Sequence, residues 1–257
     1  MKKVQNDMLS TKTLTTYLNT LLKITHIKDY TENGLQVEGA TSINKIITAV
    51  TADLSSIEYA IEQEANCLLV HHGYFWKNEP VTITGMKKRR LSLLLQHNIN
   101  LLSYHLPLDI HETYGNNVQL AKKLGFVDIH LLEENNTLCL RGELPTPMTA
   151  LNLSKHIQKQ LGRTPLHIEA EKEIITTVAW CTGSAQDFID LSARYQIDAY
   201  LSGEVSERTY YSAKEQNIHY FACGHHATEI DGVYCLGQHI EEKFNIPVIF
   251  FNSHNPI

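Results

Sequence analysis

The stretch from Asn44 to Gly73, NKIITAVTADLSSIEYAIEQEANCLLVHHG, places two apolar runs on either side of a helical pattern. The first run, KIITAV, is rich in β-branched residues, and the second, CLLV, is short and wholly apolar. Between them, apolar residues recur at helical spacing, which predicts an amphipathic helix over residues 54–65. Two strands joined by a helix pair in parallel, and a parallel sheet carries helices on its faces. This stretch therefore predicts an α/β fold.

The same alternation continues toward the middle of the chain. KKRRLSLLLQHN (87–98) predicts a helix, INLLSY (99–104) a strand, and NNVQLAKKLGF (116–126) a helix that ends at Gly125. The next segment, TLCLRGELPTPM, has a different pattern. It predicts a strand and then a turn at its prolines, followed by a helix that begins after Pro147 and ends at Gly162.

After this helix the first pattern returns. EIITTVAW (173–180) resembles KIITAV, and IDAYLSG (197–203) takes the place of NCLLVHHG. IHYFAC (218–223) then follows a further helical segment, as INLLSY does in the first half. We therefore expect two related α/β lobes with mostly parallel sheets. The predicted ranges are 1–128 for the first lobe, which the segment 224–257 joins, and 129–223 for the second.

Composition excludes several classes of protein. The chain has 257 residues, an ordinary apolar share of 43%, and a net charge of −6, which makes nucleic acid an unfavourable partner. Its five cysteines are scattered and form no CxxC pair, which favours a reducing cytoplasm over a disulfide framework. The N-terminal segment 1–22 predicts a short tail followed by an amphipathic helix, not a signal peptide. Since no apolar stretch approaches the roughly 20 residues that span a bilayer, we expect a cytoplasmic protein with no membrane contact.

Histidine is the one unusual count, with 14 in the chain. Three groups of histidines and carboxylates each follow a predicted strand, where open α/β sheets place their ligands. These groups are His71 with His72, His105 with Asp109, and His225 and His226 with Glu229. Imidazole and carboxylate together suit zinc, iron, nickel or manganese better than calcium or magnesium, which prefer oxygen ligands. A pair of metal ions needs ligands from several directions and a carboxylate that bridges them.

Local geometry allows these side chains to act as ligands. A regular strand points neighbouring side chains to opposite faces, but a strand end followed by Gly73 lets His71 and His72 face different ions. His225 and Glu229 share one face if their segment opens a helix. The alternative is that a single His-His pair is a surface or core feature and that Asp109 is a helix cap. Three such groups at equivalent places favour the metal-site interpretation.

The sequence also resembles the GTP cyclohydrolase I type 2 homologue family, whose members are called NIF-three-like or YbgI-like proteins. The matching segments extend over nearly the whole chain in the order found in the family. They are ENGLQVEG (32–39), VHHGYFWK (70–77), HLPLD (105–109), GNNVQLA (115–121) and GHHATE (224–229).

The resemblance implies a cleft between the two lobes that binds two divalent metal ions per subunit, and a toroidal homohexamer. The metal identity is left open among zinc, iron, manganese and nickel. The metal ligands that it implies are His71, His72, Asp109, His225 and Glu229, with Glu229 as the bridge. His105 also matches, and we interpret it as a catalytic proton relay that does not itself bind metal. The role of His226 is left open, as is that of Lys87–Arg90, either a solvated helix face or a phosphate contact.

Two functions are compatible with these residues. The first is a metal-dependent hydrolase of a small-molecule substrate, either a nucleotide or a related nitrogen heterocycle. A water activated by the ions would attack a ring carbon and open a cyclic amidine C–N bond, as the name GTP cyclohydrolase implies, with His105 carrying the proton. The second is a non-catalytic scaffold or metal-handling protein. Metal ligands alone do not separate the two, because both functions need them.

Overall fold

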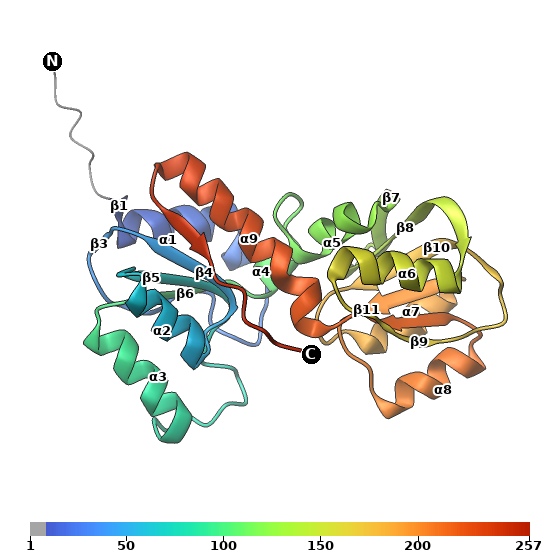
Figure 1. Cartoon of the computed structure of the whole chain (residues 1–257), viewed down its shortest axis with the longest axis horizontal. Coiled ribbons are helices and arrows are strands. Elements are labelled where there is room, and N and C mark those ends of the chain that lie inside the picture. Colours follow the sequence, from blue (N-terminus) through green and yellow to red (C-terminus); the bar gives the residue numbers. More distant parts are fainter. Residues whose placement is uncertain (1–8) are drawn as a thin grey trace, which may run out of the picture. The chain divides into compact units, whose positions relative to one another are not determined.

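The computed structural model describes residues 9–257, which divide into two compact units (Figure 1). The first unit comprises the described residues up to Leu108 together with Val233–Ser253, and the second comprises Asp109–Gly232 together with His254–Ile257. Each unit contains a mixed sheet with parallel strands at its centre and helices against it, so the predicted α/β fold with two related lobes is confirmed. The boundaries predicted for the two lobes, 1–128 and 129–223, stay a prediction.

The sheet of the first unit has five strands, four of them parallel. Its order is β13 (Val248–Phe250), β4 (Ile46–Thr51), β5 (Cys67–His72), β6 (Asn100–Ser103) and β2 (Gly34–Val37), with β2 antiparallel to β6. The register places Leu68 of β5 opposite Ile47 of β4 on one side and Leu101 of β6 on the other. These three side chains are fully buried, which accounts for the uninterrupted apolar runs in the sequence.

Four long helices pack on this sheet, two on each face (Figure 1). The apolar sides of α2 (Leu54–Glu62) and α3 (Gly85–Gln96) share a core with Ile47 and Leu68. α1 (Thr11–Leu21) and the second half of α9 (His225–Phe244) lie against the opposite face. The predicted N-terminal helix is therefore confirmed, whereas most of the tail predicted before it lies outside the described residues. Smaller elements complete the unit: β1 (Leu9–Ser10) paired with β3 (Ser42–Ile43), a 3-10 turn (Ile24–His26) and α4 (Leu106–Asp109), which ends at the boundary.

The sheet of the second unit repeats the three parallel central strands of the first. Its order is β7 (Val127–Glu133), β8 (Asn136–Thr149), β10 (Ile174–Cys181), β11 (Ala199–Ser202), β12 (His219–Ala222) and β9 (Leu166–Ile168). β10, β11 and β12 are parallel, whereas β7, β8 and β9 are joined by antiparallel pairing. The connections between the parallel strands are helical in both units, as the recurring sequence pattern predicts.

Successive residues of β10 face two different cores. Val178 and Trp180 pack with α5 (Asn116–Leu124) and α6 (Ala150–Leu161). Ala179 and Cys181 pack on the other face with α7 (Ile189–Arg194), which follows a 3-10 turn (Gln186–Phe188), and with α8 (Glu207–Glu215). The period of two is that of a strand buried on both faces. The predicted end of α5 at Gly125, in the left-handed region with φ of 73°, is confirmed.

The turn predicted at the prolines of TLCLRGELPTPM is wrong. β8 runs through Pro145 and Pro147 without interruption, and α6 begins three residues after the second proline. Pairing with β7 ends at Glu143, and the register with β10 shifts between Ile175 and Thr177. Both prolines therefore lie where the ladder is irregular or unpaired, so their missing N–H groups cost little.

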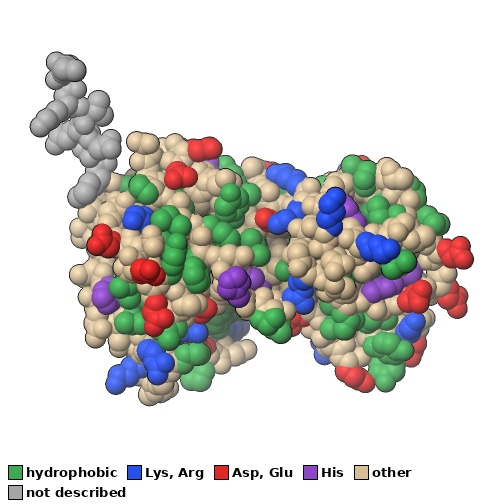
Figure 2. Space-filling view, viewed as in Figure 1, with side chains coloured by type: hydrophobic (Ala, Val, Ile, Leu, Met, Phe, Trp, Pro, Cys, Tyr) green, Lys and Arg blue, Asp and Glu red, His purple; other side chains and the backbone are tan. Residues whose placement is uncertain are grey.

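Over residues 9–257, none of the helices combines the length and the apolar character needed to cross a bilayer. Figure 2 shows acidic and basic side chains interspersed on the face that it presents. That distribution agrees with the modest net charge of −6.

The register shift in β10 depends on a buried carboxylate. Asp198 Oδ2 accepts hydrogen bonds from the backbone N–H groups of Thr176 and Thr177 at 2.8 and 3.0 Å, and Oδ1 pairs with Lys172. Burial alone would raise the pKa of Asp198, but these donors hold the pKa below its ordinary value of 3.8. The carboxylate therefore stabilises the fold above that ordinary value, and the stabilisation is lost as the pH falls through the lower folded value.

We expect Asp198→Asn to lower the free energy of unfolding by about 2 kcal/mol at pH 7, because it weakens charge-assisted hydrogen bonds. The difference from the unmodified protein should begin to shrink as the pH falls below the ordinary value of 3.8, and it should be smallest below the lowered folded pKa of Asp198, where both chains carry a neutral group. Urea unfolding at pH 7 and pH 3.5 measures it. Asp190→Asn, on the exposed side of α7, is the control. A deficit of equal size at both pH values would contradict the electrostatic origin.

Candidate metal centre

The first unit gathers three histidines at the carboxyl ends of β5 and β6. One ligand atom from each of His71, His72 and His105 lies within 4.8 Å of the other two. The rings of His71 and His72 are 4.5 Å apart, although the two residues are consecutive in one strand. Pairing between β5 and β6 ends at Val70, and pairing with β4 ends at His72. Both histidines therefore lie where β5 is still paired with β4 but no longer with β6.

Hydrogen bonds orient the first two imidazoles. His71 is fully buried, and its Nδ1 lies 3.0 Å from the Tyr104 carbonyl oxygen, which can only accept. Nδ1 must therefore carry the proton, and Nε2 has the lone pair that coordinates a metal ion. His72 Nδ1 lies 3.3 Å from the Thr51 hydroxyl. Such contacts fix the ring orientations that a metal site needs.

His105 is held by a carboxylate that the sequence did not single out. Its Nδ1–H donates to Asp29 Oδ1 at 3.0 Å, and Asp29 Oδ2 accepts from the backbone N–H of Leu106. Burial would raise the pKa of Asp29, but the hydrogen bonds from His105 and Asn33 lower it below the ordinary value. Asp29 is therefore ionised near neutral pH and directs the Nε2 of His105 away from itself.

The neighbouring ENGLQVEG segment also supports His105. Asn33 Oδ1 accepts the backbone N–H of His105 at 2.8 Å, and its amide donates to Asp29. Gly34, which follows Asn33 and begins β2, has φ of 108°, a backbone conformation that favours glycine. Trp76 packs edge-on against the His105 ring at 4.9 Å and forms an aromatic wall.

The second unit places a histidine and a carboxylate one turn apart. α9 begins at His225, so the expectation that His225 and Glu229 share a helix face is confirmed. His225 Nε2 lies 3.2 Å from Glu229 Oε2, and His225 Nδ1 donates to Glu204 Oε1 at 2.6 Å. Gly183 lies against the carboxylate, because a Cβ at that position would be 2.3 Å from Glu229 Oε1.

The charges around His225 change its protonation. Burial lowers the pKa of His225, but Glu229 and Glu204 outweigh that effect and raise it to about 9. Without a metal ion, His225 is therefore cationic at neutral pH. It must release a proton before it coordinates a metal, because only the neutral ring offers a lone pair.

Asp109 is a buried carboxylate and not a helix cap. It is the last residue of α4, and its Oδ1 accepts from the Asn116 amide at 2.8 Å and from the Thr182 hydroxyl at 3.4 Å. Thr182 follows β10 directly, so this carboxylate is tied to the same sheet edge as the other second-unit groups. His226, the residue after His225, is also buried, and its backbone N–H donates to the Ile257 backbone oxygen.

The donors in both units fit divalent metal binding. Neutral imidazoles with fixed tautomers and buried carboxylates are the ligands that zinc, iron, manganese and nickel accept. The clusters are therefore consistent with metal binding. Sequence reasoning missed two residues, Asp29 and Glu204, each of which accepts the Nδ1 proton of a histidine.

The model of the Duf34/NIF3 (NGG1p interacting factor 3) family matches residues 9–256, nearly the whole chain. The chain belongs to the Duf34/NIF3 family. The resemblance based on VHHGYFWK, HLPLD and GHHATE is thereby confirmed.

Curated members of the Duf34/NIF3 family are similar over most of their length. A Vibrio cholerae protein named GTP cyclohydrolase 1 type 2 homolog is 51% identical over 243 residues, 93% of this chain and 96% of the relative. A protein of the same name from Escherichia coli K12 is 45% identical over 240 residues, with the same coverage.

Solved structures of the Duf34/NIF3 type share the fold. Protein ybgI, described as being of unknown function, superposes with a TM-score of 0.94 at 43% identity, covering 97% of this chain and all of that protein. TTHA1606 from Thermus thermophilus gives a TM-score of 0.87 at 33% identity, again over 97% of this chain and all of the other.

Proposed function

We propose that this Duf34/NIF3 protein is a metal-dependent hydrolase of a nucleotide or a related nitrogen heterocycle. The proposed ligands of two divalent ions are His71, His72, Asp109, His225 and Glu229, with Glu229 as the bridge. When bound, the ions would supply Lewis-acid activation of water and of the substrate ring. Relatives named GTP cyclohydrolase 1 type 2 homolog support the choice of a cyclic amidine as the reacting group.

The Asp29–His105 pair is the observation that carries the catalytic proposal. A storage or delivery site needs ligands, but it does not need a third histidine beside them whose tautomer is fixed by a buried aspartate. A histidine held in this way accepts a proton at Nε2 and returns it there, while Asp29 keeps Nδ1 protonated.

Different residues of the chain have different roles in the proposed ring opening. The oxygen of water bonds to the ring carbon, its proton passes to His105 Nε2, and the C–N bond breaks when the ring nitrogen receives a proton. Asp29 and Asn33 hold His105 in place, while Trp76 and Tyr30 shield its ring from bulk water. Glu204 orients His225 through its Nδ1–H.

A turnover screen tests this function. Protein loaded in turn with zinc, iron, manganese and nickel should open the ring of at least one guanine nucleotide or pterin, detected by chromatography and mass spectrometry. A His105→Ala chain with the same metal content is the control, and its turnover should be lower by roughly 10²- to 10⁴-fold. If fully loaded protein turns over none of these compounds, the site is a metal-binding scaffold and the hydrolase proposal fails.

The family also suggests how the chain assembles and where it acts. We propose a cytoplasmic homohexamer, on the basis of the resemblance to toroidal members of the family and of five cysteines that are all free thiols. Light scattering after size-exclusion chromatography measures the assembly. A mass of one or two chains of 29.2 kDa would overturn the hexamer.

A further inference from the structure

The second unit contains a pocket of about 490 Å³ at the carboxyl ends of β11 and β12. Its volume lies within the range of roughly 300 to 1,000 Å³ that is typical of small-molecule sites. Carboxyl ends of parallel strands are also where α/β sheets bind ligands. The lining residues are Arg163, Thr164, Pro165, Leu166, Gly203, Glu204, Val205, Ala222, Gly224 and Ile257.

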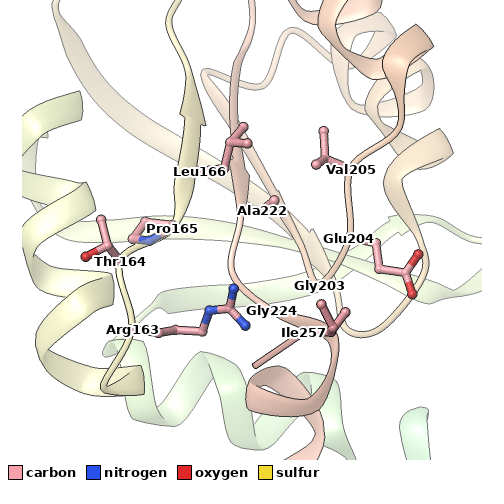
Figure 3. Close-up of a pocket in the computed structure, with 10 residues that line it drawn as sticks. All are labelled: Arg163, Thr164, Pro165, Leu166, Gly203, Glu204, Val205, Ala222, Gly224 and Ile257. Atoms are coloured by element: carbon pink, nitrogen blue, oxygen red, sulfur yellow. The ribbon is translucent and has the colours of Figure 1, made fainter. Parts of the chain in front are cut away.

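A cation and an anion lie on opposite sides of this pocket. Figure 3 shows Arg163 on one side, Glu204 on the other, and Ile257 between them. Gly224, with φ of 100°, lets the guanidinium lie against the backbone, because a Cβ there would be 2.2 Å from Arg163 Nη1. The Arg163 guanidinium therefore forms part of the pocket wall, next to Gly224.

On the Arg163 side of the pocket, backbone oxygens of the chain itself accept hydrogen bonds from the available donors. Arg163 Nη1 donates to the Pro256 carbonyl at 2.7 Å, while its Nε is buried without a hydrogen-bond partner among residues 9–257. The backbone N–H of His226, in the first turn of the 20-residue α9, donates to the Ile257 carbonyl at 2.9 Å. A guanidinium and a helix N-terminus both favour a negatively charged partner, and here their donors converge on the Pro256 and Ile257 backbone oxygens.

The Glu204 side joins the pocket to the proposed metal centre. Glu204 Oε1 accepts from His225 Nδ1, and Oε2 accepts from the Ser184 hydroxyl at 3.2 Å. Each carboxylate oxygen has two lone pairs, so both can accept a further N–H donor. Leu166 and Val205, which are 52% and 37% exposed, offer an apolar surface to the body of a ligand.

We propose that this pocket binds a small molecule with an anionic group on the Arg163 side and a ring that presents N–H donors to Glu204. Pro256 and Ile257 compete with the anionic group, so the ligand displaces them. This assignment rests on the proposed function, because the orientation puts the ring next to His225. The substrate class is a phosphorylated or carboxylated molecule with an amide- or amidine-containing ring.

Calorimetric titration of the metal-loaded full chain tests the assignment with three probes. Guanosine monophosphate carries both groups, guanosine only the ring, and ribose 5-phosphate only the anion. Arg163→Gln should weaken binding of the two phosphorylated probes roughly 10- to 100-fold, the value of a charge-assisted hydrogen bond, and leave guanosine nearly unchanged. Arg194→Gln, an exposed change of the same charge on α7, should bind all three probes as the unmodified chain does.

A second variant tests the competition. A chain that ends at Asn255 lacks both carbonyl acceptors, so it should bind guanosine monophosphate several-fold more tightly. Equal binding by Arg163→Gln and Arg194→Gln, or no binding of guanosine monophosphate by the unmodified chain, overturns the subsite. If turnover does not depend on Arg163, the hydrolase proposal stands and the subsite proposal fails. If binding depends on Arg163 but no turnover occurs, the hydrolase proposal fails and the subsite proposal stands.

Discussion

Replacing Glu229 with glutamine should remove at least one of the two metal ions that we propose for each subunit. Glu229 is only 3% exposed and lies beside His225 and Gly183, so a substituted amide has no room to turn away. Glutamine keeps the shape of the side chain but loses the negative charge that holds a divalent cation. We expect metal affinity to fall by more than the roughly 10- to 100-fold that loss of an outer hydrogen-bond partner costs.

Elemental analysis after equilibration with one metal at several concentrations measures this effect. Glu242→Gln changes an exposed carboxylate on the same helix and should keep the metal content of the unmodified protein. Circular dichroism of both variants establishes that the fold is kept. Two tightly bound equivalents in Glu229→Gln would show that Glu229 is not the bridge.

The central strands were predictable from the sequence, because parallel strands buried on both faces consist of continuous apolar runs. KIITAV, CLLV and INLLSY became β4, β5 and β6, and their counterparts became β10, β11 and β12. The outer strands gave no such signal. Val127 and Leu131 of β7 are 44% and 42% exposed, and its buried Leu132 lies three residues from the half-buried Ile129, so the strand shows no period-two alternation.

The proposed ligands were also visible, since they belong to sequence groups that lie at the end of a predicted strand or just after it. Their hydrogen-bond partners were not, because they lie far away along the chain: Asp29 and His105 are 76 residues apart. The sequence does contain one indication of the role of Glu204. Glu204 follows β11 at the position that corresponds to His72, the last residue of β5, so alignment of the two repeats marks this position. Asp29 is in a loop with no such counterpart.

The Asp29–His105 pair should control turnover without controlling metal content. His105→Ala removes the proposed proton relay, and we expect kcat to fall roughly 10²- to 10⁴-fold while KM and metal content stay close to those of the unmodified protein. Asp29→Asn should have a smaller effect, about 10- to 100-fold on kcat, because an amide still accepts from Leu106 but no longer fixes which nitrogen of His105 carries the proton.

Kinetics on the substrate identified in the screen, together with metal analysis of each variant, separate relay from ligation. Asp53→Asn is a matched control, because Asp53 caps α2 in the same unit and asparagine caps equally well. If His105→Ala loses metal in parallel with activity, His105 is a ligand and not a relay. If Asp29→Asn is as active as Asp53→Asn, the carboxylate only anchors its loop. Within the histidine cluster, Asp29 accepts a hydrogen bond from the ring of His105. Proton transfer through His105 best explains this arrangement, and these two variants decide whether that transfer takes place.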